Sequence, residues 1–168
     1  MNLFQRFLPI FLAACWVTGC DAPGDKPAHR HARADSAVGS GAELRPDLFS
    51  AAPETVEGCV GLYTYDSLNI SFDSLDVDKG KKLLATKSGS FAYLRLHGKS
   101  MILHFDSTQS AKTGEKGFRE VYRDGDYTVV LVLRTLEEEG EAVKEAGTME
   151  IIHGGKHYVI RVKGLSGC

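Results

Sequence analysis

An alternation of apolar and polar residues, broken at short intervals by glycine, runs from residue 58 to the end of the chain. A period of two places successive side chains on opposite faces of a β-strand, so this region is expected to consist of strands joined by tight turns. The run F-A-Y-L-R-L-H-G-K-S-M-I-L-H-F at 91–105 predicts a hairpin with a two-residue turn at Gly98-Lys99. Its apolar face would be formed by three cross-strand pairs: Leu96 with Met101, Leu94 with Leu103, and Ala92 with Phe105.

Two further hairpins are expected downstream. Asp124-Gly125 lies at the tip of F-R-E-V-Y-R-D-G-D-Y-T-V-V-L-V-L, and its return strand 127–133 is apolar on both faces, which favours a central position. The run T-M-E-I-I-H-G-G-K-H-Y-V-I-R-V turns at Gly154-Gly155. This turn would pair Ile151 with Tyr158 and Met149 with Ile160, again giving one apolar face.

Two more strands are expected before Gly89. One begins at Cys59, and the other carries the alternating residues Leu68, Ile70 and Phe72. The acidic stretch L-E-E-E-G-E-A-V-K-E-A-G at 136–147 is expected to be a solvated connection, either one helical turn or a long loop. The pattern predicts an all-β fold of about eight strands, an antiparallel meander that is either closed as a small barrel or flattened into a sandwich.

The region before this β-pattern has a different composition. Residues 21–56 hold four of the five prolines, many small residues and no sustained period, which is typical of a disordered tether. The segment H-R-H-A-R at 29–33 could meet anionic headgroups or a metal ion, but a solvated linker segment is the expected role. We therefore divide the chain into a targeting segment at 1–19, a tether at 20–56 and a β-domain at 57–168.

Charge argues against one class of partner. The chain carries 20 basic and 22 acidic side chains, for a net charge of -2, and 43% of its residues are hydrophobic. Duplex nucleic-acid binders need a strong positive charge, so no nucleic-acid partner is expected.

The first nineteen residues, MNLFQRFLPIFLAACWVTG, have the pattern of a signal peptide. Arg6 precedes about eleven apolar residues, which fall short of the roughly 20 that a spanning helix needs. The segment ends in V-T-G-C, and this tetrapeptide resembles the lipobox of bacterial lipoproteins. The resemblance implies cleavage before Cys20, a thioether-linked lipid on its sulfur and acylation of its new amine. The alternative is an ordinary secretory signal followed by an incidental Cys20.

A lipobox implies that the protein is anchored to a bilayer of the bacterial cell envelope, on the periplasmic face, with the choice of inner or outer membrane open. Cys15 would then be removed with the signal and Cys20 would be acylated, leaving Cys59 and Cys168. In an oxidising compartment these two are expected to form a disulfide. The alternative is two free thiols.

Two further resemblances concern the β-domain. C-V-G-L-Y at 59–63, A-Y-L-R-L-H-G-K at 92–99 and the terminal G-L-S-G-C resemble a loose set of uncharacterised bacterial lipoproteins, which implies no activity. The architecture is also similar to that of the membrane-bound inhibitors of c-type lysozyme, which are lipidated small barrels with an inhibitory S-G-x-x-Y element. Here Ser88-Gly89 is followed by Tyr93, one residue too late, and the only tryptophan is Trp16, in the signal.

No residue pattern in the domain predicts a catalytic or metal site. A zinc ion needs three or four ligands that converge at about 2 Å. The candidate ligands in the domain are not expected to meet this requirement: His97, His104, His153 and His157. Asp73, Asp76 and Asp78 do not have the spacing of an EF-hand loop. Ser88, Ser90 and Ser107 lie in no nucleophile context. The six tyrosines are expected to pack across strands, with an aromatic ligand mouth as the alternative.

The sequence therefore favours a non-enzymatic, membrane-tethered binding or interaction module without a cofactor. Its partner would be a protein, or a small apolar ligand held inside the barrel. An inhibitor of a cell-wall-degrading enzyme such as lysozyme, and an unrecognised hydrolase, are the alternatives.

Overall fold

The structure is a computed structural model that describes residues 41–53, 55–56 and 58–168. The predicted signal peptide, Cys20 and the H-R-H-A-R segment lie outside the described residues. The described chain contains two short 3-10 helices, η1 (Ala42–Leu44) and η2 (Phe72–Ser74). It also contains strands β1 (Val60–Tyr65), β2 (Leu84–Lys87), β3 (Phe91–Leu96), β4 (Lys99–Phe105), β5 (Ala111–Lys112), β6 (Gly117–Asp124), β7 (Tyr127–Glu139), β8 (Ala142–His153) and β9 (Lys156–Gly167).

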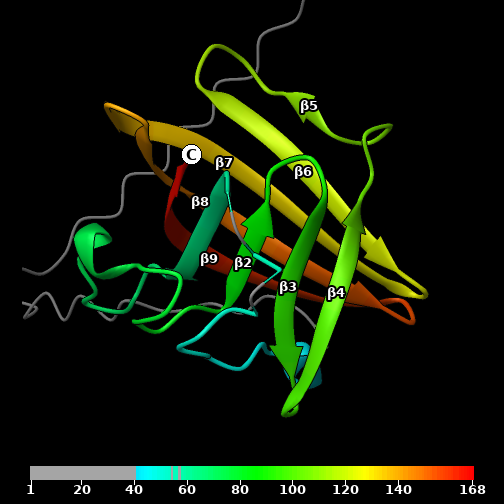
Figure 1. Cartoon of the computed structure of the whole chain (residues 1–168). Helices are drawn as coiled ribbons and strands as arrows, with labels where there is room; N and C mark the ends of the chain where they lie inside the picture. The colour runs from blue at the N-terminus through cyan, green and yellow to red at the C-terminus, as the bar shows by residue number, and fades with distance from the viewer. Residues whose placement is uncertain (1–40, 54, 57) are drawn as a thin grey trace, which may run out of the picture. The chain divides into compact units, whose positions relative to one another are not determined.

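The strands form a closed antiparallel barrel. Their order is β4-β3-β2-β1-β9-β8-β7-β6-β5, and β4 also pairs with β6 through His104↔Arg123 and Phe105↔Tyr122. Eight strands make the barrel, and β5 is an extra strand on the edge of β6. In Figure 1 the strands β2 to β4 cross β6 to β9 at a steep angle. The predicted all-β class is thus confirmed, and the barrel rather than the sandwich is the architecture.

The last of the three predicted hairpins has the expected pairing: Ile151 pairs with Tyr158 and Met149 with Ile160. The second hairpin is present, but Asp124 pairs with Tyr127, so its turn residues are Gly125 and Asp126 rather than the predicted Asp124 and Gly125.

The predicted register of the first hairpin, 91–105, was wrong by two residues. Leu96 pairs with Lys99 and Leu94 with Met101, so the turn residues are His97 and Gly98 rather than Gly98 and Lys99. Both have a positive φ, 51° and 75°, as a type I′ turn requires. A shift of two residues keeps every side chain on its predicted face, which is why the apolar pattern did not distinguish the two registers.

Two segments differ from the prediction in their secondary structure. Residues 68–72 are not a strand: they belong to the β1–β2 connection, where η2 forms, and β2 begins only at Leu84. The acidic stretch 136–147 is not a loop or a helical turn. It is the end of β7 and the start of β8, joined by a turn at Gly140-Glu141, with a register shift between Thr135 and Glu137.

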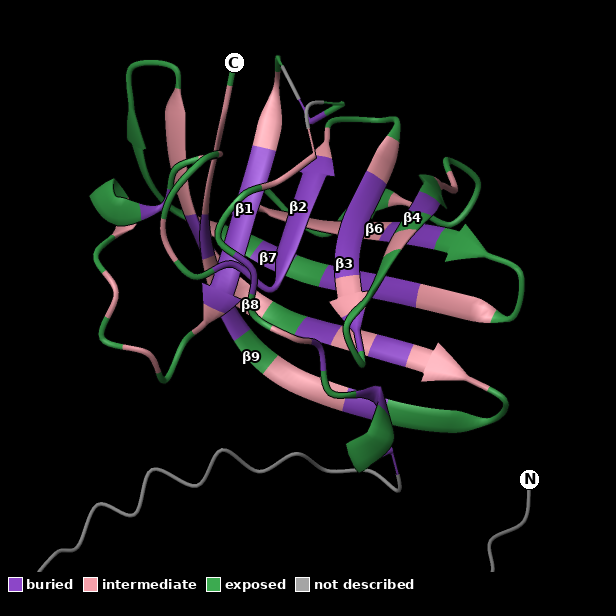
Figure 2. Ribbon diagram, turned by 60° about the horizontal axis from the view of Figure 1, so that its bottom comes forward, coloured by how far each residue is buried: buried purple, intermediate pink, exposed green. Residues whose placement is uncertain are grey.

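The predicted boundary of the tether at residue 56 was also wrong. Leu44, Phe49 and Val56 are buried, and Phe49 forms a β-bridge with Lys82. Phe49 and Val56 pack against the barrel because the outer face of β1 to β3 is itself apolar, with Leu62 and Tyr93 among its residues, whereas Leu44 joins the interior cluster. As Figure 2 shows, β1, β2 and β3 are buried over most of their length, whereas the tips of the β6–β7 and β8–β9 hairpins are exposed.

The barrel interior is filled with side chains. Inward positions on every barrel strand contribute to one apolar cluster, which also includes Leu44 from η1. Its fully buried members include Leu84, Leu103, Leu131, Met149 and Ile151. These side chains occupy the space that a hollow barrel would offer to a ligand.

Lys82 fixes the outer covering of the barrel. Its side chain is fully buried, and its ammonium donates to the carbonyl oxygens of Ser50, Asp76 and Lys79, the last two at 2.5 and 2.6 Å. A buried ammonium needs such partners, and here they come from two separate covering segments. Burial lowers the pKa of Lys82 from its usual value.

Candidate functional site

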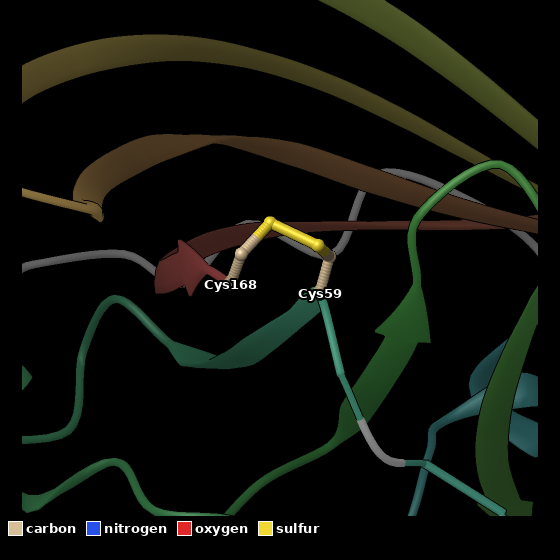
Figure 3. Close-up of a disulfide and its surroundings, with 2 residues drawn as sticks. All are labelled: Cys59 and Cys168. Carbon is tan, nitrogen blue, oxygen red and sulfur yellow. A yellow bond between two sulfur atoms is a disulfide. The ribbon is translucent and has the colours of Figure 1, made fainter.

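The predicted disulfide is present. Cys59 and Cys168 are bonded with an S–S distance of 2.07 Å and a sequence separation of 109 residues (Figure 3). The sheet explains the pairing, because β1 begins directly after Cys59, β9 ends directly before Cys168, and Val60 pairs with Gly167. The bond therefore fastens the two central strands of the sheet order at one end of the barrel.

The candidate metal ligands are dispersed. His97 lies in the β3–β4 turn, and the ring of His153 lies 3.9 Å from that of Tyr127. His157 Nδ1 is 2.8 Å from Glu150 Oε1, and His104 is exposed on β4. Within residues 41–53, 55–56 and 58–168, no group of three or more His, Cys, Asp and Glu side chains could hold a metal ion.

The other candidates take part in local structure. Asp73 lies in η2, and the amide of Asp78 donates to Asp76 Oδ1 at 2.9 Å, which stabilises a turn. Ser88, Ser90 and Ser107 are exposed in loops. Tyr93, the residue nearest to a lysozyme-inhibitor tyrosine, is buried against Phe49, with ring centroids 5.0 Å apart.

A buried polar cluster that the sequence analysis did not identify lies inside the barrel. The Tyr63 hydroxyl donates to Glu145 Oε2 at 2.8 Å, and the Ser166 hydroxyl donates to Glu145 Oε1 at 2.9 Å. The Tyr122 hydroxyl donates to Glu120 Oε2 at 2.8 Å. Both oxygens of Glu145 and Oε2 of Glu120 thus accept hydrogen bonds within the barrel, so this cluster supports the packing of the interior.

Burial controls the protonation of this cluster. It raises the pKa of both Glu120 and Glu145, and the negative charge of Glu120 raises the pKa of Glu145 further. Burial also raises the pKa of Tyr63 and Tyr122 above the usual range, so both phenols remain protonated donors.

Two glycines make room for the cluster. A Cβ atom on Gly164 would lie 2.2 Å from Tyr63 Cδ1, and one on Gly61 would lie 2.7 Å from the Tyr63 hydroxyl. Only glycine allows the tyrosine ring to lie across both strands.

The alternation of side chains along β8 and β6 could have revealed that Glu145 and Glu120 face the interior. Glu145 has the same parity along β8 as Met149 and Ile151, which were predicted to face inward, and Glu120 has the same parity along β6 as Tyr122. Extending the predicted faces into the acidic stretch would have placed Glu145 inside.

The outer surface of β6 to β9 carries a group of cations, of which Arg134 and Arg161 are exposed and Arg119 and Lys163 half-buried. Along these strands, inward residues such as Leu131, Leu133 and Val162 alternate with outward cations. We call this surface the basic face and define it by four residues: Arg119, Arg134, Arg161 and Lys163. In the described part of the chain, none of the four lies in an ion pair with a carboxylate; Arg119 donates to the Gln109 carbonyl, and Lys163 Nζ lies 5.9 Å from the centre of the Phe72 ring.

Two pockets on the described surface are open to solvent. One, of about 240 Å³, lies beside the disulfide and is lined by Val60, Leu62 and Leu165. Another, of about 380 Å³, lies beside η1 between Arg45, Asp47 and His97. In the part of the chain that the structure covers, no helix is long and apolar enough to cross a membrane.

Comparisons with protein-family models, with curated protein sequences and with solved structures give no match for this chain.

Proposed function

We propose that the protein is a non-enzymatic lipoprotein of the bacterial cell envelope, anchored through an acylated Cys20, and that its barrel acts as a binding or interaction module. The filled interior carries this proposal. Because apolar side chains and the paired Glu–Tyr cluster occupy the barrel, the chemistry available to a partner lies on the outer surface. This favours a partner that contacts the outside of the domain over a small apolar ligand held inside it.

The disulfide agrees with export to an oxidising compartment. Its cysteines are the two that remain once Cys15 is removed and Cys20 is acylated. By contrast, the inhibitor alternative gains no support from Tyr93, whose ring is buried and whose hydroxyl lies 2.8 Å from Ser100 Oγ.

The anchor can be tested in bacterial cells that express the full chain with its own signal. We expect wild-type protein in the membrane fraction, with an N-terminal mass that corresponds to an acylated Cys20. The Cys20→Ser variant should lose this mass, and the mature domain should move to the soluble fraction. Cys15→Ser is the matched control, because that residue would be removed with the signal, and it should behave as wild type. An unacylated wild-type N-terminus would refute the proposal.

A further inference from the structure

The two halves of the barrel surface differ in how they are covered. The outer face of β1 to β3 lies under the 46–56 segment and the β1–β2 connection, which bury Leu62, Ala85 and Tyr93. The middle of the basic face has no comparable covering, since Val132 is 42% exposed and Thr148, Arg134 and Arg161 are also exposed. At its edges Arg119, next to β5, and Lys163, beside Phe72, are half-buried.

Strand pairing arranges the four cations in two rows. The first row crosses β6 to β9 and consists of successive cross-strand partners: Arg119, Val132, Thr148 and Arg161. The second row crosses β7 to β9 and consists of Arg134, Ala146 and Lys163. Neighbouring strands lie about 4.8 Å apart, so the Cα atoms of Arg134 and Lys163 are separated by roughly 10 Å and those of Arg119 and Arg161 by roughly 14 Å. Small residues separate the cations on β8, which leaves both rows open to a broad anionic surface.

This concentration of positive charge contrasts with the rest of the domain. Residues 41–168 contain 16 Lys and Arg against 19 Asp and Glu, so the domain as a whole is acidic. Three carboxylates on β7 and β8 have partners of their own: Glu137 and Glu139 pair with Lys144, and Glu150 Oε1 lies 2.8 Å from His157 Nδ1. The four cations form a local group of positive charge on an otherwise acidic domain.

The position where the described chain begins indicates the occupant. A Cβ atom on Gly41 would lie 2.8 Å from the carbonyl oxygen of His157, so the chain enters the fold beside the start of β9, one of the strands of the basic face. Cys20 precedes Gly41 by 21 positions. Even a fully extended chain of that length reaches only roughly 70 Å, which keeps the barrel close to the bilayer that holds the anchor.

We propose that the basic face docks onto the anionic lipid headgroups of the bilayer in which Cys20 is anchored. This inference rests on the proposed function. The four cations contact headgroup phosphates, and the exposed Val132 lies between Arg119 and Arg161 at the interface. Docking fixes one side of the barrel against the membrane and leaves the covered β1–β3 side turned away from it.

A vesicle cosedimentation experiment tests the docking without the anchor. It uses the processed chain, residues 20–168, with Cys20→Ser, and compares vesicles of pure phosphatidylcholine with vesicles that contain phosphatidylglycerol. We expect binding to the anionic vesicles only, and weaker binding when the salt concentration rises from about 50 to about 300 mM. The triple variant Arg134→Gln, Arg161→Gln, Lys163→Gln should lose at least about tenfold in partition coefficient.

The matched control is the triple variant Lys79→Gln, Lys81→Gln, Lys99→Gln, which removes the same charge from exposed positions elsewhere. It should keep most of the binding, and circular dichroism should show that both variants are folded. Equal losses in the two variants, equal binding to both kinds of vesicle, or no binding would overturn the proposal. So would displacement by inorganic phosphate at constant ionic strength, which would indicate a discrete phosphate site instead.

This result is independent of the anchor. Vesicle binding through the basic face together with an unacylated Cys20 in cells would retain the docking surface and reject the lipoprotein. An acylated Cys20 without vesicle binding would support the lipoprotein and reject the docking surface.

Discussion

At the scale of single residues, a notable feature is that Lys82 and Glu145 are buried and that Glu120 is half-buried inside the barrel. Each takes part in at least one hydrogen bond within the fold. Polar groups inside a protein are tolerated when they are hydrogen-bonded, and removing one partner costs more than the bond itself contributes. The two carboxyl groups therefore link the stability of the barrel to pH.

The direction of this linkage follows from the raised pKa values. The folded protein binds protons on Glu120 and Glu145 more tightly than the unfolded chain, where a Glu side chain titrates near pH 4.3. Their contribution to the free energy of unfolding is complete below about pH 4 and is lost as the pH rises through the folded-state values. We expect urea titrations from pH 4 to pH 8 to show a smaller fall in stability for Glu120→Gln/Glu145→Gln than for wild type.

Glu43→Gln is the control of opposite sign. The hydrogen bond from Lys156 lowers the pKa of Glu43, so its contribution is present above the unfolded-state pKa and disappears as the pH falls. The difference between wild type and this variant should grow with rising pH. If the stability of the double variant fell as much as that of wild type, or more, between pH 4 and pH 8, the protonation scheme of the barrel interior would be wrong.

At the scale of elements, the segment at 46–56 forms part of the domain. Phe49 is 4% exposed and packs edge-on against Tyr93, whereas its neighbour Leu48 is 38% exposed. We expect Phe49→Ala to lower the free energy of unfolding by about 3–5 kcal/mol, because it opens a cavity over the outer face of β3. Leu48→Ala should change it by less than about 0.5 kcal/mol. Equal effects in a urea titration would mean that this segment does not stabilise the barrel.

The same elements show what a sequence can and cannot predict here. The register of the hairpin at 149–160 was predictable, because adjacent glycines at 154 and 155 fix the turn. The register of the hairpin at 91–105 was not predictable, because Gly98 fits either turn position and the observed turn requires His97 to adopt a positive φ. Residues 68–72 alternate like a strand although they belong to the covering of the barrel. Alternation reports which residues face an apolar surface, and it does not report whether that surface is a neighbouring strand.

At the scale of the whole molecule, the disulfide and the sheet order reinforce each other. The bond joins the ends of β1 and β9, which are neighbours in the barrel although 109 residues separate their cysteines. We expect Cys59→Ser/Cys168→Ser to retain the β-barrel in circular dichroism but to lose roughly 4–5 kcal/mol of unfolding free energy, since the bond restricts a long loop of the unfolded chain. A reducing agent should produce the same loss in wild type and none in the variant. A loss below about 1 kcal/mol would show that the sheet alone sets the stability.

The position of this bond has a topological consequence. All eight barrel strands lie between Cys59 and Cys168, so the barrel is a covalent ring. A protease that cuts any one loop of the ring, such as the exposed connection around β5, produces a nicked molecule whose two pieces remain linked until a reductant separates them. A single cut would therefore release no fragment of the barrel into the surroundings.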